Sequence, residues 1–264
     1  MTITGKTRVY AHIGFPIGHV RTPTLYNGLL EDCGIDVVVV PFEVAPEDLA
    51  SAVPGFRAWR GLAGVGVTIP HKETMARLID ELTPMARLCG ATNVIRRDPD
   101  GRLIGGQFDG TGLVKSLVNL GREVAGARVL LVGAGGTARA VAFALADACV
   151  GRLEINNRTR ERAEAIIAAV GAAYGDCDAA LYAGGRDFDI VVNTTSLGMK
   201  SDDPLPVDAE LLQPGMVVAD AVMAPPETAL LRLAAERGCT PHPGLLMLRA
   251  QFEMTLEFLG LVQQ

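Results

Sequence analysis

The sequence predicts an α/β protein of two domains with mainly parallel sheets. Strand-like and helix-like patterns alternate along both halves of the chain, as they do when helices connect parallel strands. The 264 residues suffice for two modest domains, and 30 glycines and 15 prolines supply the many turns that such a protein needs.

The composition limits the classes of partner. The net charge is −6 and no Lys/Arg cluster forms a stripe, so we expect no nucleic-acid partner. No apolar run reaches membrane-spanning length and the N-terminus lacks a signal-peptide core, so we expect no membrane association. The five cysteines are scattered without metal-ligand spacing, which favours a reducing cytoplasm and argues against a metal site.

In the first half of the chain, strands are expected at 9–13, 37–40 and 64–69, each followed by a helical pattern. The pairs Thr22-Pro23 and Ile69-Pro70 are typical helix starts, with proline at the first helical position. Asp109 and the three residues after it precede a helical stretch at 113–120 and are expected to cap it.

The second half is expected to carry four further strands, at 128–132, 153–156, 189–193 and 216–220. Between the second and third of them, residues 161–170 have apolar side chains at helical spacing. A last helix is expected at 245–259, after the Pro243-Gly244 turn.

A glycine turn follows the first of these four strands. Its spacing, Gly133-x-Gly135-x-x-Ala138, is the dinucleotide-binding fingerprint of a Rossmann domain. Such a turn lets a pyrophosphate approach the backbone at the positive end of a helix. We therefore expect a nucleotide on the turn, rather than a turn that only packs; the residues expected to hold it are Gly133, Ala134, Gly135, Gly136, Thr137 and Ala138.

The end of the next strand distinguishes the two nicotinamide cofactors. An NAD site usually has Asp or Glu there for the ribose 2′-hydroxyl, whereas Arg accommodates the 2′-phosphate of NADP. This chain has Asn157, Arg158 and Thr159, followed by Arg162. We expect NADP, with NAD as the alternative; the competing interpretation is a solvated helix start with Arg–Glu pairs.

Several segments between residues 14 and 251 resemble, in order, motifs of the shikimate dehydrogenase family. These are Gly14-Phe-Pro-Ile-Gly-His19, Val65-Gly-Val-Thr-Ile-Pro-His-Lys72, Cys89-Gly-Ala-Thr-Asn93, Gly105-Gly-Gln-Phe-Asp-Gly110, the nucleotide turn, Asn157-Arg158-Thr159, Asn193-Thr-Thr-Ser-Leu-Gly-Met199 and Gly244-Leu-Leu-Met247-Leu-Arg-Ala-Gln251. Ordered matches of this kind are far more specific than any single motif.

The resemblance implies an N-terminal α/β substrate domain formed by residues 1–110 and 245–264. A Rossmann dinucleotide-binding domain would occupy 111–244. It also implies an NAD(P)-dependent alcohol dehydrogenase of the shikimate pathway, which transfers a hydride between the nicotinamide and a ring carbon bearing a hydroxyl. Further cofactor contacts are implied at Thr194, Thr195, Met223, Gly244 and Met247.

The catalytic pair of the family falls on Lys72 and Asp109. Oxidation of an alcohol needs a group that accepts the hydroxyl proton and returns it in the reverse reaction. A cation at a helix N-terminus is disfavoured, which would help Lys72 act as a base, while Asp109 would favour its charged form. The alternatives are a surface lysine on an amphipathic helix and an N-capping aspartate.

The substrate end departs from the family pattern. Val20 and Gly66 replace a serine and an asparagine, Phe108 replaces a threonine, and Met223 aligns with a tyrosine that helps to hold the carboxylate. The hydroxyl-binding centre is kept in Thr68, Lys72, Asn93, Asp109 and Gln251, and Thr22 keeps one of the two hydroxyls that bind the carboxylate. Loss of two or three hydrogen bonds of ~1–1.5 kcal/mol each predicts shikimate activity reduced on the order of hundreds-fold. Arg21 is either a new carboxylate contact or a solvent-facing loop residue.

The expected substrate is thus shikimate or a related cyclic polyol acid. Two alternatives are a quinate/shikimate dehydrogenase that uses NAD, and a non-catalytic nucleotide-binding sensor. Retention of both Lys72 and Asp109 argues against the sensor. The sequence leaves monomer and homodimer open, as well as a biosynthetic or catabolic direction.

Overall fold

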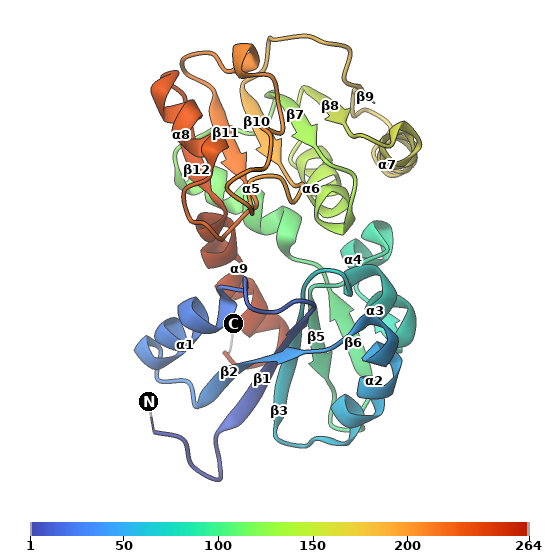
Figure 1. Ribbon diagram of the computed structural model, residues 1–264. Helices are drawn as coiled ribbons and strands as arrows, with labels where there is room; N and C mark the ends of the chain where they lie inside the picture. Colours follow the sequence, from blue (N-terminus) through green and yellow to red (C-terminus); the bar gives the residue numbers. More distant parts are fainter. Residues whose placement is uncertain (1, 263–264) are drawn as a thin grey trace. The chain divides into compact units, whose positions relative to one another are not determined.

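The computed structural model describes residues 2–262, which form two compact units (Figure 1). The first unit runs to Phe108 and resumes at Gln251; the second comprises Asp109–Ala250. The chain therefore returns to the first unit inside its last helix and not at the start of that helix. Early residues of the helix pack in the second unit, where Gly244 lies against backbone carbonyls of Asp220 and Val222.

The first unit holds a mixed six-stranded sheet of order β2-β1-β3-β5-β6-β4. β1 runs parallel to β2 and β3 and β4 runs parallel to β6, while β5 is antiparallel to both of its neighbours. The elements are β1 (Arg8–Gly14), α1 (Thr22–Asp32), β2 (Val37–Glu43), η1 (Pro46–Asp48), α2 (Leu49–Ala58), β3 (Leu62–Val67), α3 (Lys72–Leu78), β4 (Glu81–Leu82), α4 (Pro84–Cys89), β5 (Val94–Arg97) and β6 (Leu103–Gly106).

Strand alternation separates the two faces of β1. Ala11 and Ile13 join a fully apolar core with the buried residues of β3 and α2. On the opposite face Tyr10 is buried near Tyr26 of α1, which packs edge-on against Phe252 of the last helix at 5.0 Å between ring centroids. Each such buried side chain contributes about 1.5–3 kcal/mol, so both faces of this sheet stabilise the unit.

The second unit is a parallel six-stranded sheet of order β12-β11-β10-β7-β8-β9. Counted along the chain from β7, this order is 3-2-1-4-5-6, that of the Rossmann fold. Its elements are α5 (Asp109–Asn119), β7 (Arg128–Val132), α6 (Gly136–Asp147), β8 (Arg152–Asn156), α7 (Arg160–Ala173), β9 (Ala179–Leu181), β10 (Ile190–Asn193), η2 (Ala209–Leu211), β11 (Val217–Asp220), α8 (Ala229–Glu236), β12 (Thr240–Pro243) and α9 (Gly244–Phe258).

Two predicted helix starts are wrong. α3 begins at Lys72, because a turn closed by the His71 amide on the Thr68 carbonyl holds Pro70 outside the helix. α5 begins at Asp109 and not after a four-residue cap, since the acidic residue occupies the first turn, where the helix dipole favours it. Among residues 2–262, no helix is both long and apolar enough to cross a membrane.

Candidate active site

The glycine turn joins β7 to α6 in the conformation that the fingerprint requires. Gly133 has a φ of +114° and its amide donates to the Asn156 carbonyl. Gly135 precedes the first residue of α6 and is exposed, and a Cβ there would meet open space. Ala138 is fully buried, so the helix packs close to the sheet. The turn lies between β7 and β10, where the strand order reverses, which is where such sheets bind ligands.

Two arginines stand without an ion-pair or hydrogen-bond partner beyond the end of β8. Arg158 and Arg162 are exposed, and no contact within residues 2–262 engages their guanidinium groups. One of the Arg–Glu pairs that the sequence offered as an alternative does form, between Arg160 and Glu164 at 2.8 Å. The Asn157 amide donates to the Thr159 carbonyl and shapes the turn between them. The free guanidiniums suit a phosphate.

The loop after β10 is braced by its own side chains. The Thr194 hydroxyl donates to the Val132 carbonyl at 2.7 Å, and the Thr195 hydroxyl donates to Asn193 Oδ1 at 2.7 Å. Because each hydroxyl already donates its proton, it could contact a cofactor only as an acceptor. Of the other predicted cofactor residues, Met223 is half-buried and Met247 is buried, and Gly244 begins α9.

The predicted catalytic residues each begin a helix. Lys72 is half-buried at the first position of α3, and its carbonyl accepts from the amide of Thr92 in the segment before β5. Asp109 is buried at the start of α5. A Cβ at Gly110 would collide with the Ala140 carbonyl of α6, so glycine lets α5 pack closely there and fixes the position of Asp109.

A hydrogen-bonded cluster holds the predicted substrate amides in the first unit. Asn93 is buried and donates from Nδ2 to Gln251 Oε1 at 3.1 Å, while its Oδ1 accepts the Phe108 amide at 2.9 Å. The Phe108 ring packs edge-on against Phe258 at 5.4 Å. The cluster joins β5, α9 and the segment that leads to Asp109.

Further predicted substrate residues lie in the loop after β1 and just after β3. Thr22 is buried as the first residue of α1, whereas Val20 is half-buried and Arg21 is exposed. Thr68 is half-buried after β3, and its amide donates to the Ile13 carbonyl at 2.9 Å. Exposure of Arg21 agrees with the solvent-facing interpretation.

One polar residue of this region escaped the sequence reasoning. His12 lies opposite Gly66 in the register of β1 and β3, and it is buried. A Cβ at Gly66 would collide with His12 Nδ1, so the imidazole fills the space beside the glycine. Its position in the middle of an apolar strand is the one feature of the sequence that could have marked His12 as a candidate site residue.

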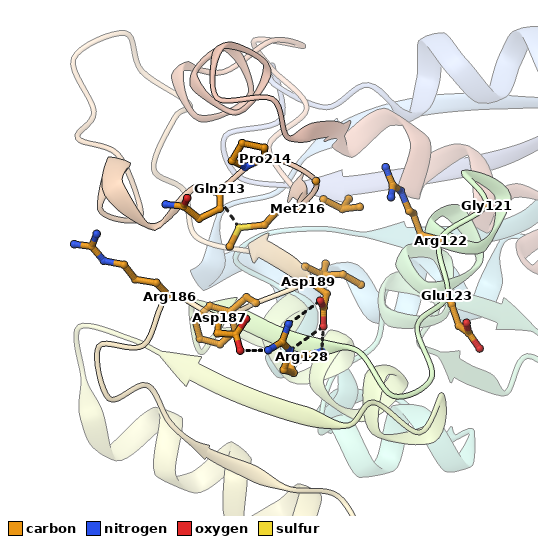
Figure 2. Close-up of a pocket in the computed structure, with 14 residues that line it drawn as sticks. Gly121, Arg122, Glu123, Arg128, Arg186, Asp187, Asp189, Gln213, Pro214 and Met216 are labelled. Atoms are coloured by element: carbon orange, nitrogen blue, oxygen red, sulfur yellow. Dashed lines mark hydrogen bonds and ion pairs between the residues drawn. The ribbon is translucent and has the colours of Figure 1, made fainter.

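A separate polar pocket of about 490 Å³ lies in the second unit (Figure 2). It is formed by the amino ends of β7, β10 and β11, opposite the edge that carries the glycine turn. Arg128 there is bound by Asp187 and Asp189, as the dashed lines in Figure 2 mark. These carboxylates raise the pKa of the Arg128 guanidinium, chiefly through the Asp189 hydrogen bond.

The chain combines a Rossmann unit that has exposed arginines beyond β8 with a unit that carries a lysine, amides and a buried histidine, and this combination defines a nicotinamide-nucleotide-dependent oxidoreductase. Family models agree: residues 12–95 match the shikimate dehydrogenase substrate binding domain, and residues 113–199 match shikimate/quinate 5-dehydrogenase. The chain belongs to the shikimate dehydrogenase family.

Individual relatives extend over almost the whole chain. The NADP(+) shikimate dehydrogenase of Geobacter metallireducens is 42% identical over 97% of this chain and 92% of its own length. The shikimate 5-dehydrogenase of Thermus thermophilus, solved with NADP(H) and shikimate, is 30% identical with a TM-score of 0.86, covering 97% of this chain and 95% of its own. The ligand-free 5-ketofructose reductase of a Gluconobacter strain is 31% identical with a TM-score of 0.85, covering 97% and 93%.

Proposed function

We propose that this protein is an NADP-dependent dehydrogenase that interconverts a ring hydroxyl and a ketone on shikimate or a related cyclic polyol acid. The observation that carries the proposal is the set of polar side chains beside β3 and β5, with Lys72 at a helix start and Asn93 bonded to Gln251. These groups have the chemistry to bind a hydroxylated ring and to move a proton.

In this proposal Lys72 accepts the hydroxyl proton as the alcohol is oxidised and returns it in the reverse reaction. Asp109 is the second member of the catalytic pair that the family resemblance implies. Asn93, Gln251 and Thr68 orient the ring through its hydroxyls, and Thr22 binds its carboxylate. Binding the ring in one orientation converts the transfer into an effectively unimolecular step, which accounts for much of the rate gain in such enzymes.

The cofactor residues present fit NADP. Gly135 leaves open space at the positive end of α6, where phosphate is favoured, and Arg158 and Arg162 would hold the 2′-phosphate. When bound, NADP⁺ supplies the hydride acceptor. The residues Gly133–Ala138, Asn157 and Thr159 would line the nucleotide, as would the loop at Thr194 and Thr195.

A second candidate substrate is a neutral ketose. Val20 leaves an apolar side chain where the family pattern has a hydroxyl, and Gly66 and Met223 remove further polar groups. A relative named for 5-ketofructose reduction shares 31% of its sequence with this chain. An apolar binding site discriminates only weakly between shikimate and a ketose of similar size. Both compounds are therefore tested as substrates in the same assay.

The assay follows reduced-nicotinamide absorbance with shikimate, quinate and 5-ketofructose, each with the NADP and the NAD couple. We expect turnover of shikimate with NADP⁺, slower than a biosynthetic enzyme by on the order of hundreds-fold because two or three hydrogen bonds are lost. Tight nucleotide binding without any turnover would instead support a sensor.

The five free cysteines support a cytoplasmic location, and we propose a monomer or homodimer.

A further inference from the structure

We infer that His12 is a substrate-positioning residue that donates a hydrogen bond from Nε2 to an oxygen of the bound substrate beside Lys72. This inference rests on the proposed function and adds a residue to its site. His12 comes from β1, two residues before the first family motif begins at Gly14.

The geometry encloses one side of the imidazole. His12 is only 7% exposed, and its Nδ1 has no hydrogen-bond partner among residues 2–262. Nδ1 occupies the space that a Cβ atom on Gly66 would fill. A Cβ at that place would also lie 2.8 Å from Tyr10 Oη. Nδ1 has no acceptor within hydrogen-bonding distance among residues 2–262, so a proton there would be left without a partner. The proton is accordingly placed on Nε2.

The charge state of His12 is neutral. Its pKa is lowered from 6.5 to about 3, chiefly by burial and to a smaller extent by the positive charges of Lys72 and His19. A neutral imidazole has one N–H donor and one acceptor nitrogen. Since Nδ1 is enclosed, Nε2–H is the donor available to a ligand. A neutral donor next to the Lys72 amine binds a hydroxyl oxygen without adding a second positive charge.

The surrounding residues are those of the substrate site. His12 shares its register position with Gly66, which lies two residues before Thr68 and six before Lys72. Among residues 2–262, Nδ1 is an enclosed atom without a partner, whereas Nε2 is not among the enclosed unpartnered atoms, so Nε2 is the nitrogen of His12 that a substrate oxygen could reach.

The test compares His12→Ala, Gly66→Ala and the double variant, with shikimate and NADP⁺. We expect His12→Ala to raise the KM for shikimate about tenfold, with a much smaller change in kcat, because the lost bond is present in both ground and transition states. Gly66→Ala should have a similar effect, since its methyl group displaces the imidazole. The double variant should be no worse than either single variant, because both remove one interaction.

Rescue separates positioning from a structural role. In the His12→Ala background, Gly66→Asn places an amide in the vacated space and should recover part of the lost kcat/KM. The matched control is His242→Gln in the second unit: this residue is also buried with an unpartnered Nδ1, but its Nε2 is bonded to Ser116. That variant should leave the KM for shikimate unchanged.

An unchanged KM for shikimate in His12→Ala, with the wild type active, would overturn the inference and leave the proposed function intact. A fall in thermal stability without a KM change would also overturn it, because it would assign His12 to packing. If the wild type turned over no member of the substrate panel, the proposed function would fail first.

Discussion

The two units differ in how closely they follow their family. In the second unit the strand order and the glycine turn are those of a Rossmann fold, and Arg158 and Arg162 are exposed beyond the end of β8. In the first unit the polar centre around Lys72 and Asn93 is kept, whereas Val20 and Gly66 are changed and His12 fills the space beside Gly66. The nucleotide motif therefore keeps the family pattern, whereas the substrate end departs from it.

The largest expected effect comes from the catalytic residue. Lys72→Ala should reduce kcat by about 10²–10⁴-fold, because the proton acceptor is lost. The dissociation constant for NADP⁺ should stay the same, since Lys72 lies in the first unit and the nucleotide residues in the second. Steady-state kinetics and calorimetric titration measure the two quantities. Survival of turnover would remove Lys72 from the acid/base role.

The next effect tests the second unit. Replacing Arg158 and Arg162 by alanine should raise the KM for NADP⁺ about 10–100-fold, because charge-assisted hydrogen bonds of roughly 1.5–3 kcal/mol are lost. The KM for NAD⁺ should not change. Arg160→Ala is the matched control, since its guanidinium is already bound by Glu164 and its loss should leave both constants unaltered. Equal effects on both cofactors would show that the arginines do not read the 2′-phosphate.

The next prediction concerns the pH dependence of the unfolding free energy, to which His12 of β1 contributes. The folded pKa of His12 is about 3, below its unfolded value of 6.5, so the unfolded state binds the extra proton between these values. The stability of the wild type should therefore fall as pH drops from 6.5 towards 3, by up to about 1.4 kcal/mol per pH unit from this group.

The control for this prediction is His12→Gln, whose free energy of unfolding should depend less steeply on pH in the same window. Urea unfolding at several pH values measures both proteins. Identical slopes would mean that His12 is not held neutral by its surroundings. Asp80 contributes separately at lower pH, because its hydrogen bond from Arg57 lowers its pKa and that stabilisation is lost as the carboxylate protonates.

The smallest effect concerns the apolar end of the substrate site. Val20→Ser restores a hydroxyl beside Thr22 and should lower the KM for shikimate by up to about tenfold, through one hydrogen bond of 0.5–1.5 kcal/mol. Val20→Ala removes apolar bulk without adding a hydroxyl and should not reproduce the gain. If both variants behave alike, Val20 does not face the carboxylate end.

Much of the nucleotide unit could be predicted because its signals are local. β7 spans the predicted residues 128–132, and the glycine turn has the predicted conformation. The short strands β9 and β12 escaped prediction, since three or four residues carry little periodicity. In the first unit β5 and β6 escaped prediction for the same reason, and with them the antiparallel part of the sheet.

The site residues followed from motif order, but their surroundings did not. Asn93 and Gln251 meet only because α9 returns to the first unit, 158 positions along the chain. His12 could not be assigned from spacing, because its role depends on a cross-strand register with Gly66 that the sequence does not reveal. Likewise, sequence alone could not distinguish the paired Arg160 from the unpaired Arg158 and Arg162.

The most direct test measures steady-state rates at increasing shikimate concentrations, once with NADP⁺ and once with NAD⁺. We predict that kcat/KM for NADP⁺ exceeds that for NAD⁺ by at least about tenfold, because the arginines contact the 2′-phosphate. We also predict that shikimate is oxidised but with a high KM. A preference for NAD⁺ together with a low KM for shikimate would contradict both the assigned cofactor contacts and the altered substrate end.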